Sequence, residues 1–172
     1  GWAVTVTGGQ VRSGAGKVEV FSRQGTIALT KEGTYGSGNF GEAVAGVADL
    51  DGDGVSDLVV GAGYDRDVPS GDRLGAVYLL SGADGAIVDI SLGDLRADQW
   101  GAVIEAAGDV DGDGTDDVLV ASNAADKLAA GDKIEENNGL VRVLAGEDFS
   151  RVIVEARGAP EDKLGKAATI VG

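Results

Sequence analysis

The sequence contains no histidine and no cysteine among its 172 residues. Without histidine the commonest general base is absent, and neither a Ser-His-Asp nor a Cys-His arrangement can form. Without cysteine there is no thiol nucleophile, and no disulfide from which a redox compartment can be inferred. The Gly14-Ala15-Gly16-Lys17 stretch lacks the full phosphate-loop pattern, and no nucleophile elbow or dinucleotide fingerprint occurs. We therefore expect that the chain is not an enzyme.

Proline, long apolar runs and positive charge are also scarce. Only 2 prolines accompany 30 glycines, which predicts many tight turns rather than a Pro-rich disordered tract. No apolar run approaches the roughly 18 residues of a membrane span, so we expect no membrane insertion. With 14 basic against 29 acidic residues the formal net charge is −15, which makes nucleic acid a poor partner.

Two acidic runs stand out against this background. They are Asp49-Leu50-Asp51-Gly52-Asp53-Gly54-Val55-Ser56-Asp57 and Asp109-Val110-Asp111-Gly112-Asp113-Gly114-Thr115-Asp116-Asp117. Each reads D-x-D-G-D-G-x-x-D, and they begin about 60 residues apart, a spacing that indicates a structural repeat. Calcium prefers six to eight oxygen ligands, and Asp at positions 1, 3 and 5 supplies carboxylates. Glycine at positions 4 and 6 lets the backbone close around the ion.

The pattern differs from that of an EF-hand, which needs an acidic residue at position 12 and flanking helices. Position 12 is Val60 and Val120, within β-branched runs that predict a strand. A solvated Asp-Gly turn would explain one run, but two matching copies favour calcium. Position 7 is expected to offer a backbone carbonyl and position 9 a closing carboxylate. The expected ligands are Asp49, Asp51, Asp53, Val55 and Asp57 at one Ca²⁺ site, and Asp109, Asp111, Asp113, Thr115 and Asp117 at the other.

The two runs belong to a longer repeat of short extended segments. Phe40-Gly41 matches Trp100-Gly101 and Leu164-Gly165. Four segments in a period of about 60 residues predict a four-stranded antiparallel sheet, as in a β-propeller blade. Asp126–Glu136 is the one segment with the propensity for a turn of helix. In the middle unit the expected strands are Glu42–Ala48, Leu58–Ala62, Ala76–Ser81 and Ala86–Ile90.

These features resemble the FG-GAP repeats of the integrin alpha-subunit β-propeller and its bacterial relatives. The resemblance rests on Phe40-Gly41, on Gly61-Ala62-Gly63 in place of the family's Gly-Ala-Pro, and on the acidic loop between them, which the family uses for calcium. It implies an all-β fold of integrin alpha-like propeller blades that form an incomplete ring in this chain. It also implies an extracellular or cell-surface location and a non-enzymatic role in adhesion or surface assembly.

We expect a single propeller segment over residues 1–172. It divides into a partial blade at 1–38, blades with calcium loops at 39–98 and 99–162, and the first strand of a further blade at 163–172. The N-terminal unit aligns in two ways. Either Gly1-Trp2-Ala3-Val4 matches Gly41-Glu42-Ala43-Val44, which deletes the loop and a strand, or Val4–Gly9 matches Leu58–Gly63, so that the chain starts just past a loop.

Incomplete units leave sheet faces and edges that need neighbours. Three interpretations follow: a slice of a longer propeller, a subunit that pairs with copies of itself, or ends ordered differently from the family. The chain has no signal peptide or initiator methionine, and we expect a mature, processed or excised form. The expected partners are a protein, other copies of the chain or a cell-surface glycan. The alternative function is the scaffold part of a secreted polysaccharide-active enzyme.

Several other residues have two interpretations. Trp2, Phe40 and Trp100 could form a ligand-stacking set, but the repeat spacing of Phe40 and Trp100 predicts that these two pack between blades instead. By the resemblance, charged loops between the second and third strands of a unit are candidates for recognition, although a solvated loop is the favoured interpretation. The residues of these loops are Asp65, Arg66, Asp67 and Asp72 in one unit, and Asp126, Asp132, Glu135, Glu136 and Asn137 in the next.

Overall fold

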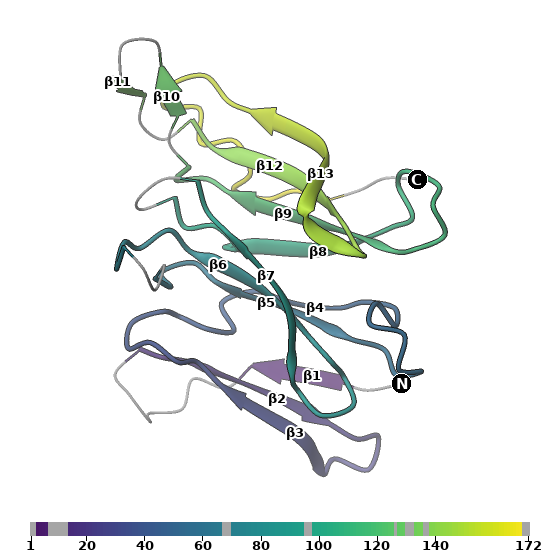
Figure 1. Cartoon of the computed structure of the whole chain (residues 1–172). Helices are drawn as coiled ribbons and strands as arrows, with labels where there is room; N and C mark the ends of the chain where they lie inside the picture. Colours follow the sequence, from purple (N-terminus) through teal and green to yellow (C-terminus); the bar gives the residue numbers. More distant parts are fainter. Residues whose placement is uncertain are drawn as a thin grey trace.

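The computed structural model describes residues 3–6, 14–66, 70–94, 98–125, 127–129, 133–135 and 138–169. Within these ranges every regular element is a β-strand, which confirms the predicted all-β class. Three antiparallel sheets stack in chain order (Figure 1). None of the described residues belongs to a helix of the length and apolarity that crossing a membrane requires.

The first sheet has three strands in the order β1-β2-β3. Ala3 of β1 lies opposite Phe21 of β2, as Leu58 lies opposite Leu80 in the next sheet. β1 therefore takes the place of a blade's second strand, which supports the second N-terminal alignment with the register moved by one residue. The strands are β1 (Ala3–Val6), β2 (Lys17–Phe21) and β3 (Ile27–Glu32).

The second and third sheets each have four antiparallel strands, as the repeat predicts. Their orders are β4-β5-β6-β7 and β8-β9-β12-β13. The second sheet consists of β4 (Val44–Gly46), β5 (Leu58–Ala62), β6 (Ala76–Leu80) and β7 (Ile87–Leu92). The third consists of β8 (Val103–Gly108), β9 (Asp117–Ser122), β12 (Leu140–Ala145) and β13 (Asp148–Arg157). These sheets have the strand number and order predicted for propeller blades, and the described strands do not close a ring.

The described residues of the segment Asp126–Glu136 do not form the expected turn of helix. Instead β10 (Lys127–Ala129) and β11 (Lys133–Glu135) pair as an antiparallel hairpin between β9 and β12. Gly131-Asp132 in the middle of the segment is a turn signal. Pairing the two arms satisfies their backbone groups, and helix propensity is a weak preference that such context overrides.

The strand β5 shows where the core lies. All of its residues are buried, because alternate side chains face two different neighbouring sheets. Val60 packs in a cluster with Val18 of the first sheet, whereas Val59 packs in a cluster with Val118 of the third. The apolar core therefore consists of the two spaces between successive sheets.

Aromatic residues at matching places fill these two spaces. Phe40 is buried between the first and second sheets, with its ring centroid 5.5 Å from that of Tyr78. Trp100 is fully buried between the second and third sheets, and its Nε1 donates to the Ser91 hydroxyl at 3.2 Å. Both residues pack between blades as predicted. Trp2 lies outside the described residues.

The last described residues run along the third sheet. Leu164 forms a parallel bridge with Gly139, as Trp100 does with Gly75. The Thr169 hydroxyl donates to Glu105 of β8 at 2.8 Å. Residues 158–169 form no strand, and the strand predicted over 163–172 extends beyond the described residues, so it stays a prediction.

Candidate metal centres

Each acidic run connects the first two strands of a four-stranded sheet. Loop 1 (residues 49–57) joins β4 to β5, and loop 2 (residues 109–117) joins β8 to β9. Gly52 and Gly54 have φ values of 81° and 92°, and Gly112 and Gly114 have values of 81° and 95°. These backbone conformations are strained for any residue with a Cβ, which explains glycine at positions 4 and 6.

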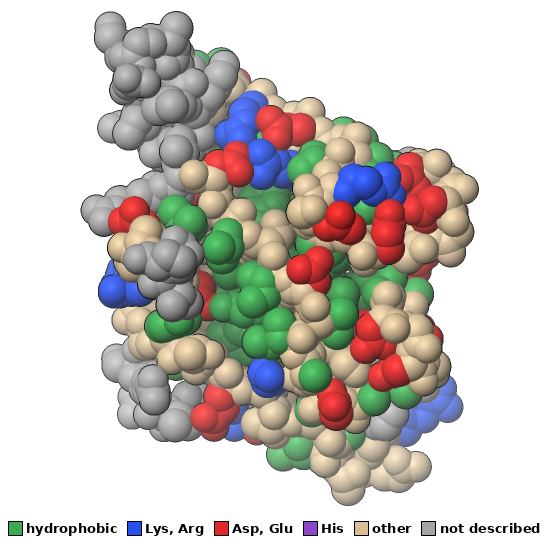
Figure 2. Space-filling view, in the orientation of Figure 1, with side chains coloured by type: hydrophobic (Ala, Val, Ile, Leu, Met, Phe, Trp, Pro, Cys, Tyr) green, Lys and Arg blue, Asp and Glu red, His purple; other side chains and the backbone are tan. Residues whose placement is uncertain are grey.

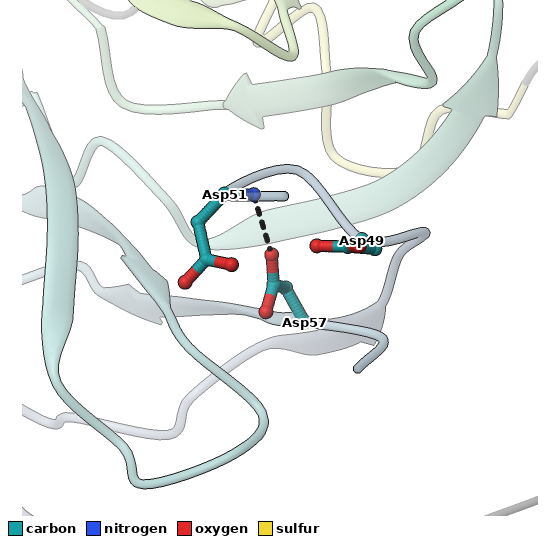
Figure 3. Close-up of side chains that lie close together, drawn as sticks. All are labelled: Asp49, Asp51 and Asp57. Atoms are coloured by element: carbon teal, nitrogen blue, oxygen red, sulfur yellow. Dashed lines mark hydrogen bonds between the residues drawn. The ribbon is translucent and has the colours of Figure 1, made fainter. Parts of the chain in front are cut away.

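Three carboxylates gather in each loop. Oxygen atoms of Asp49, Asp51 and Asp57 all lie within 4.8 Å of one another, and those of Asp109, Asp111 and Asp117 do the same. Figure 3 shows the first group, with the Asp57 carboxylate beside those of Asp51 and Asp49. In each group the residues at positions 1 and 3 are exposed, and the residue at position 9 is buried. Six of the eight predicted carboxylates are thus brought together as two clusters.

The carboxylate at position 1 organises the turn. Asp49 Oδ1 accepts the N–H groups of Gly52 and Asp53 at 2.7 and 3.0 Å, and Oδ2 accepts that of Gly54 at 2.8 Å. Asp109 makes the same three bonds in loop 2, at 2.7, 3.0 and 2.9 Å. Hydrogen bonds to an ionised acceptor are stronger than neutral ones, so the sequence spacing itself shapes both loops.

The carboxylate at position 9 ties each loop to a neighbouring turn. Asp57 Oδ2 accepts the N–H of Leu50 at 2.8 Å, while Oδ1 accepts that of Gly82, after β6, at 2.9 Å. Burial raises the pKa of Asp57, although these N–H groups oppose the shift. Asp117 accepts the N–H of Gly146, after β12, at 3.2 Å. Sequence reasoning missed this second role, for which Gly82 and Gly146 at matching places were the signal.

Position 5 lies outside both clusters. Asp53 Oδ2 accepts the Ser81 hydroxyl at 3.1 Å, and its Oδ1 accepts the N–H of Val55 at 2.7 Å. Asp113 Oδ1 likewise accepts the N–H of Thr115 at 2.8 Å. The backbone carbonyls of Val55 and Thr115, expected at position 7, stay predictions.

The donor set in each cluster suits a hard divalent cation. A carboxylate offers about four lone-pair sites, so the N–H bonds described above leave acceptor capacity on Asp49 and Asp57. All the side-chain donors are oxygens, which calcium prefers in a flexible arrangement. One buried and two exposed carboxylates give an ion access from solvent together with a fixed anchor.

Loop 2 also contacts a positively charged side chain, that of Arg151. Arg151 of β13 donates Nη1 to Asp111 Oδ2 at 2.6 Å and Nη2 to Asp113 Oδ2 at 3.0 Å. The hydrogen bond and charge of Arg151 lower the pKa of Asp111. Within the described part of the chain, no lysine or arginine pairs with a carboxylate of loop 1. Sequence reasoning missed Arg151 because the pairing joins residues about 40 positions apart.

The charged loop after β5 corrects one expectation. Asp65 is only 2% exposed and accepts the Tyr78 hydroxyl at 2.5 Å. Burial, followed by this carboxylate, raises the pKa of Tyr78. Asp65 is therefore a buried anchor, and both the solvated and the recognition interpretations are wrong for it. Several other candidates lie outside the described residues, namely Asp67, Asp126, Asp132, Glu136 and Asn137.

Comparison with known proteins identifies the repeat. The FG-GAP repeat model matches residues 40–80 and 102–144, and each match contains one acidic loop together with the strand before it and the strand after it. The chain contains two FG-GAP repeats, one over each of these ranges. The predicted resemblance is thereby confirmed.

Two integrin alpha chains are among the proteins to which this chain is similar. It is 38% identical over 114 residues to integrin alpha-4 of Xenopus laevis, and 31% identical over 111 residues to integrin alpha pat-2 of Caenorhabditis elegans. The matches cover 62% and 60% of this chain. They cover 11% and 8% of the relatives, so the chain spans only about a tenth of their length.

Proposed function

We propose that the chain is a non-catalytic, calcium-binding FG-GAP propeller segment that serves extracellular adhesion, protein binding or surface assembly. The observation that carries this proposal is the gathering of three carboxylates in each of two loops at equivalent places of the repeat. In this proposal Asp53 and Val55 complete the ligands of loop 1, and Asp113 and Thr115 complete those of loop 2.

The role of the ion in this proposal is structural. Four carboxylates within one nine-residue loop repel one another, and a bound divalent cation offsets that repulsion. Asp57 also holds the turn after β6 through Gly82, so fixing its carboxylate links the loop to that turn. A ligand that binds only the folded state stabilises it by about 2.7 kcal/mol when its concentration is a hundred times Kd.

Thermal unfolding in calcium and in chelator tests the calcium sites. We expect calcium to raise Tm by about 5–10 °C per filled site, because a domain of this size gains roughly 2–4 °C per kcal/mol. Asp51→Asn and Asp111→Asn should each remove about half of the rise, whereas Glu32→Gln, an exposed change on β3, should keep it. An unchanged Tm together with no calcium binding in a calorimetric titration contradicts the proposal.

Exposed apolar side chains support a protein partner. Ile87 and Ile90 on β7 are 46% and 44% exposed, and Val154 on β13 is 48% exposed. Figure 2 shows apolar side chains gathered on this face over the second sheet. The partner in this proposal is another protein or a further copy of the chain. Light scattering in calcium tests the second option, and a strict monomer at high concentration contradicts it.

A further inference from the structure

The two loops have different neighbours at position 5. Leu80 and Leu144 hold matching places, because each lies opposite the residue that follows position 9. The next residue is Ser81 in the second sheet, whose hydroxyl donates to Asp53. In the third sheet it is Ala145, which has no donor. The hydroxyl group that donates to position 5 of loop 1 therefore has no equivalent at the matching place beside loop 2.

Its replacement is the Arg151 guanidinium. This group reaches loop 2 from β13 and bridges two of its carboxylates, at positions 3 and 5. Asp111 at position 3 is also one of the three carboxylates of the second cluster. The Arg151 guanidinium, with Nη1 2.6 Å from Asp111 Oδ2, thus occupies one of the two oxygens that Asp111 offers to a divalent cation. The guanidinium and the cation would also repel each other at this range.

Glu147 gives the arginine a second acceptor. Both Nε and Nη2 of Arg151 donate to Glu147 Oε1, four residues earlier in the same hairpin. Glu147 is 44% exposed and lies outside the nine residues of loop 2. When Arg151 leaves Asp111 and Asp113, it therefore keeps an ion pair and does not stay unpaired.

We propose that Arg151 is an internal competitor for the cation at loop 2, so that the two calcium sites are unequal. Loop 1 fills at lower calcium, and loop 2 fills only when Arg151 leaves Asp111 and Asp113 and keeps its ion pair with Glu147 alone. Occupancy of loop 2 is then coupled to the β12–β13 hairpin that carries the arginine. This inference rests on the proposed calcium binding and adds the order of filling and the residue that sets it.

A calorimetric calcium titration of loop 2 alone tests the proposal. In the Asp51→Asn background, which disables loop 1, we expect Arg151→Gln to tighten binding about tenfold, given one unit charge removed at short range in water. Lys166→Gln removes the same charge from an exposed residue with no described contact to either loop, and should leave the affinity unchanged. The calcium-dependent rise of Tm should increase in parallel.

The reverse substitution sharpens the test. Ala86 immediately precedes the residue opposite Leu80, as Arg151 precedes the residue opposite Leu144. Ala86→Arg in the Asp111→Asn background should therefore weaken calcium binding at loop 1 by several-fold.

The outcomes separate the two proposals. Unchanged or weaker binding in Arg151→Gln overturns the competitor role, because an arginine that organises the loop would strengthen its affinity for the ion. If that result comes with clear calcium binding, the proposed function still stands. Absence of calcium binding in the unmodified chain and in both single-loop backgrounds overturns both proposals.

Discussion

The two spaces between sheets are built from matching positions but are packed differently. Between the first and second sheets, Leu29 reaches across to Gly85, where a Cβ would lie 2.7 Å from a Leu29 methyl group. Between the second and third sheets the sizes are exchanged. Phe149, which follows Asp148 in the turn as Gly85 follows Asp84, is 1% exposed. Its N–H donates at 3.0 Å to Asp89, which has the place of Leu29 in the strand register. One repeat thus achieves contact between blades by opposite exchanges of large and small residues.

At the first interface these side chains do not fill all of the space between the sheets. A pocket of about 520 Å³ remains between the first and second sheets, with Val20, Leu29 and Val47 among its lining residues. The second interface instead has a charged cluster that consists of Asp94, Arg142 and Arg157. Arg142 donates two hydrogen bonds to Asp94, at 3.0 and 2.7 Å, and lies 5.5 Å from the centre of the Trp100 ring. We infer that the interface of the second and third sheets is the more stable of the two.

Truncation of the central aromatics should give the largest difference. We expect Trp100→Ala to lower the free energy of unfolding by about 4–5 kcal/mol and Phe40→Ala by about 3 kcal/mol. Truncating the tryptophan removes more buried volume, and it also removes the contacts that Ser91 and Arg142 make with the indole ring. Urea unfolding at pH 7 measures both values. Equal losses would show that the two interfaces are equivalent.

The exchanged pair should give a smaller contrast in the same direction. Phe149→Ala is expected to cost about 3 kcal/mol, because the side chain is almost completely buried. Leu29→Ala should cost only about 1–2 kcal/mol, since Leu29 is half-buried and lines an existing pocket. The same denaturant series measures both. A larger loss for Leu29→Ala would reverse the proposed ranking.

The charged cluster should make the stability of the second interface depend on pH in the acid range. Burial alone would raise the pKa of Asp94, but hydrogen bonds and charge from Arg142 and Arg157 outweigh it, and the net pKa is lowered. Because the folded-state pKa lies below the unfolded one, this stabilisation is present above about pH 4 and is lost as the pH falls through the folded value.

The Asp94→Asn substitution measures that contribution. Asp94 is 39% exposed, so we expect a loss of at most about 1 kcal/mol at pH 7. The difference from the unmodified chain should shrink toward zero near pH 3. Glu32→Gln, on the first sheet, is the matched control. A loss of stability that does not change between pH 7 and pH 3 contradicts the proposed contribution of the charged cluster.

Filling the pocket should narrow the gap between the interfaces. Ala28 of β3 lines the pocket, and Ala28→Ile adds a β-branched side chain that suits a strand. We expect a gain of about 0.5–1 kcal/mol, in the range of other cavity-filling changes. Thr30→Ile, on the same strand but outside the pocket, should give no comparable gain. A stabilisation that is the same at both positions would show that strand propensity, not the pocket, is responsible.

Sequence reasoning anticipated the repeated elements well, because their signals are local. β5 begins and ends where the apolar run predicts, and both acidic loops lie between the first and second strands of a sheet. Positive φ at Gly52 and Gly54 follows from the D-G-D-G spacing alone. The same reasoning went wrong at Asp126–Glu136, where the contacts of a hairpin prevail over helix propensity, and it misjudged Asp65, whose partner Tyr78 lies on another strand.

The sequence by itself determined the all-β class, the repeat period, the blade-packing aromatics and the carboxylates that each loop presents, because these depend on neighbouring residues and regular spacing. The tertiary structure alone decided that β1 is a second strand and that Asp57 holds the turn at Gly82. It also decided that Arg151 lies on loop 2, with no counterpart on loop 1 among the described residues. These features join residues far apart in the chain. The packing of strands determines which of them meet, and spacing along the sequence carries no record of it.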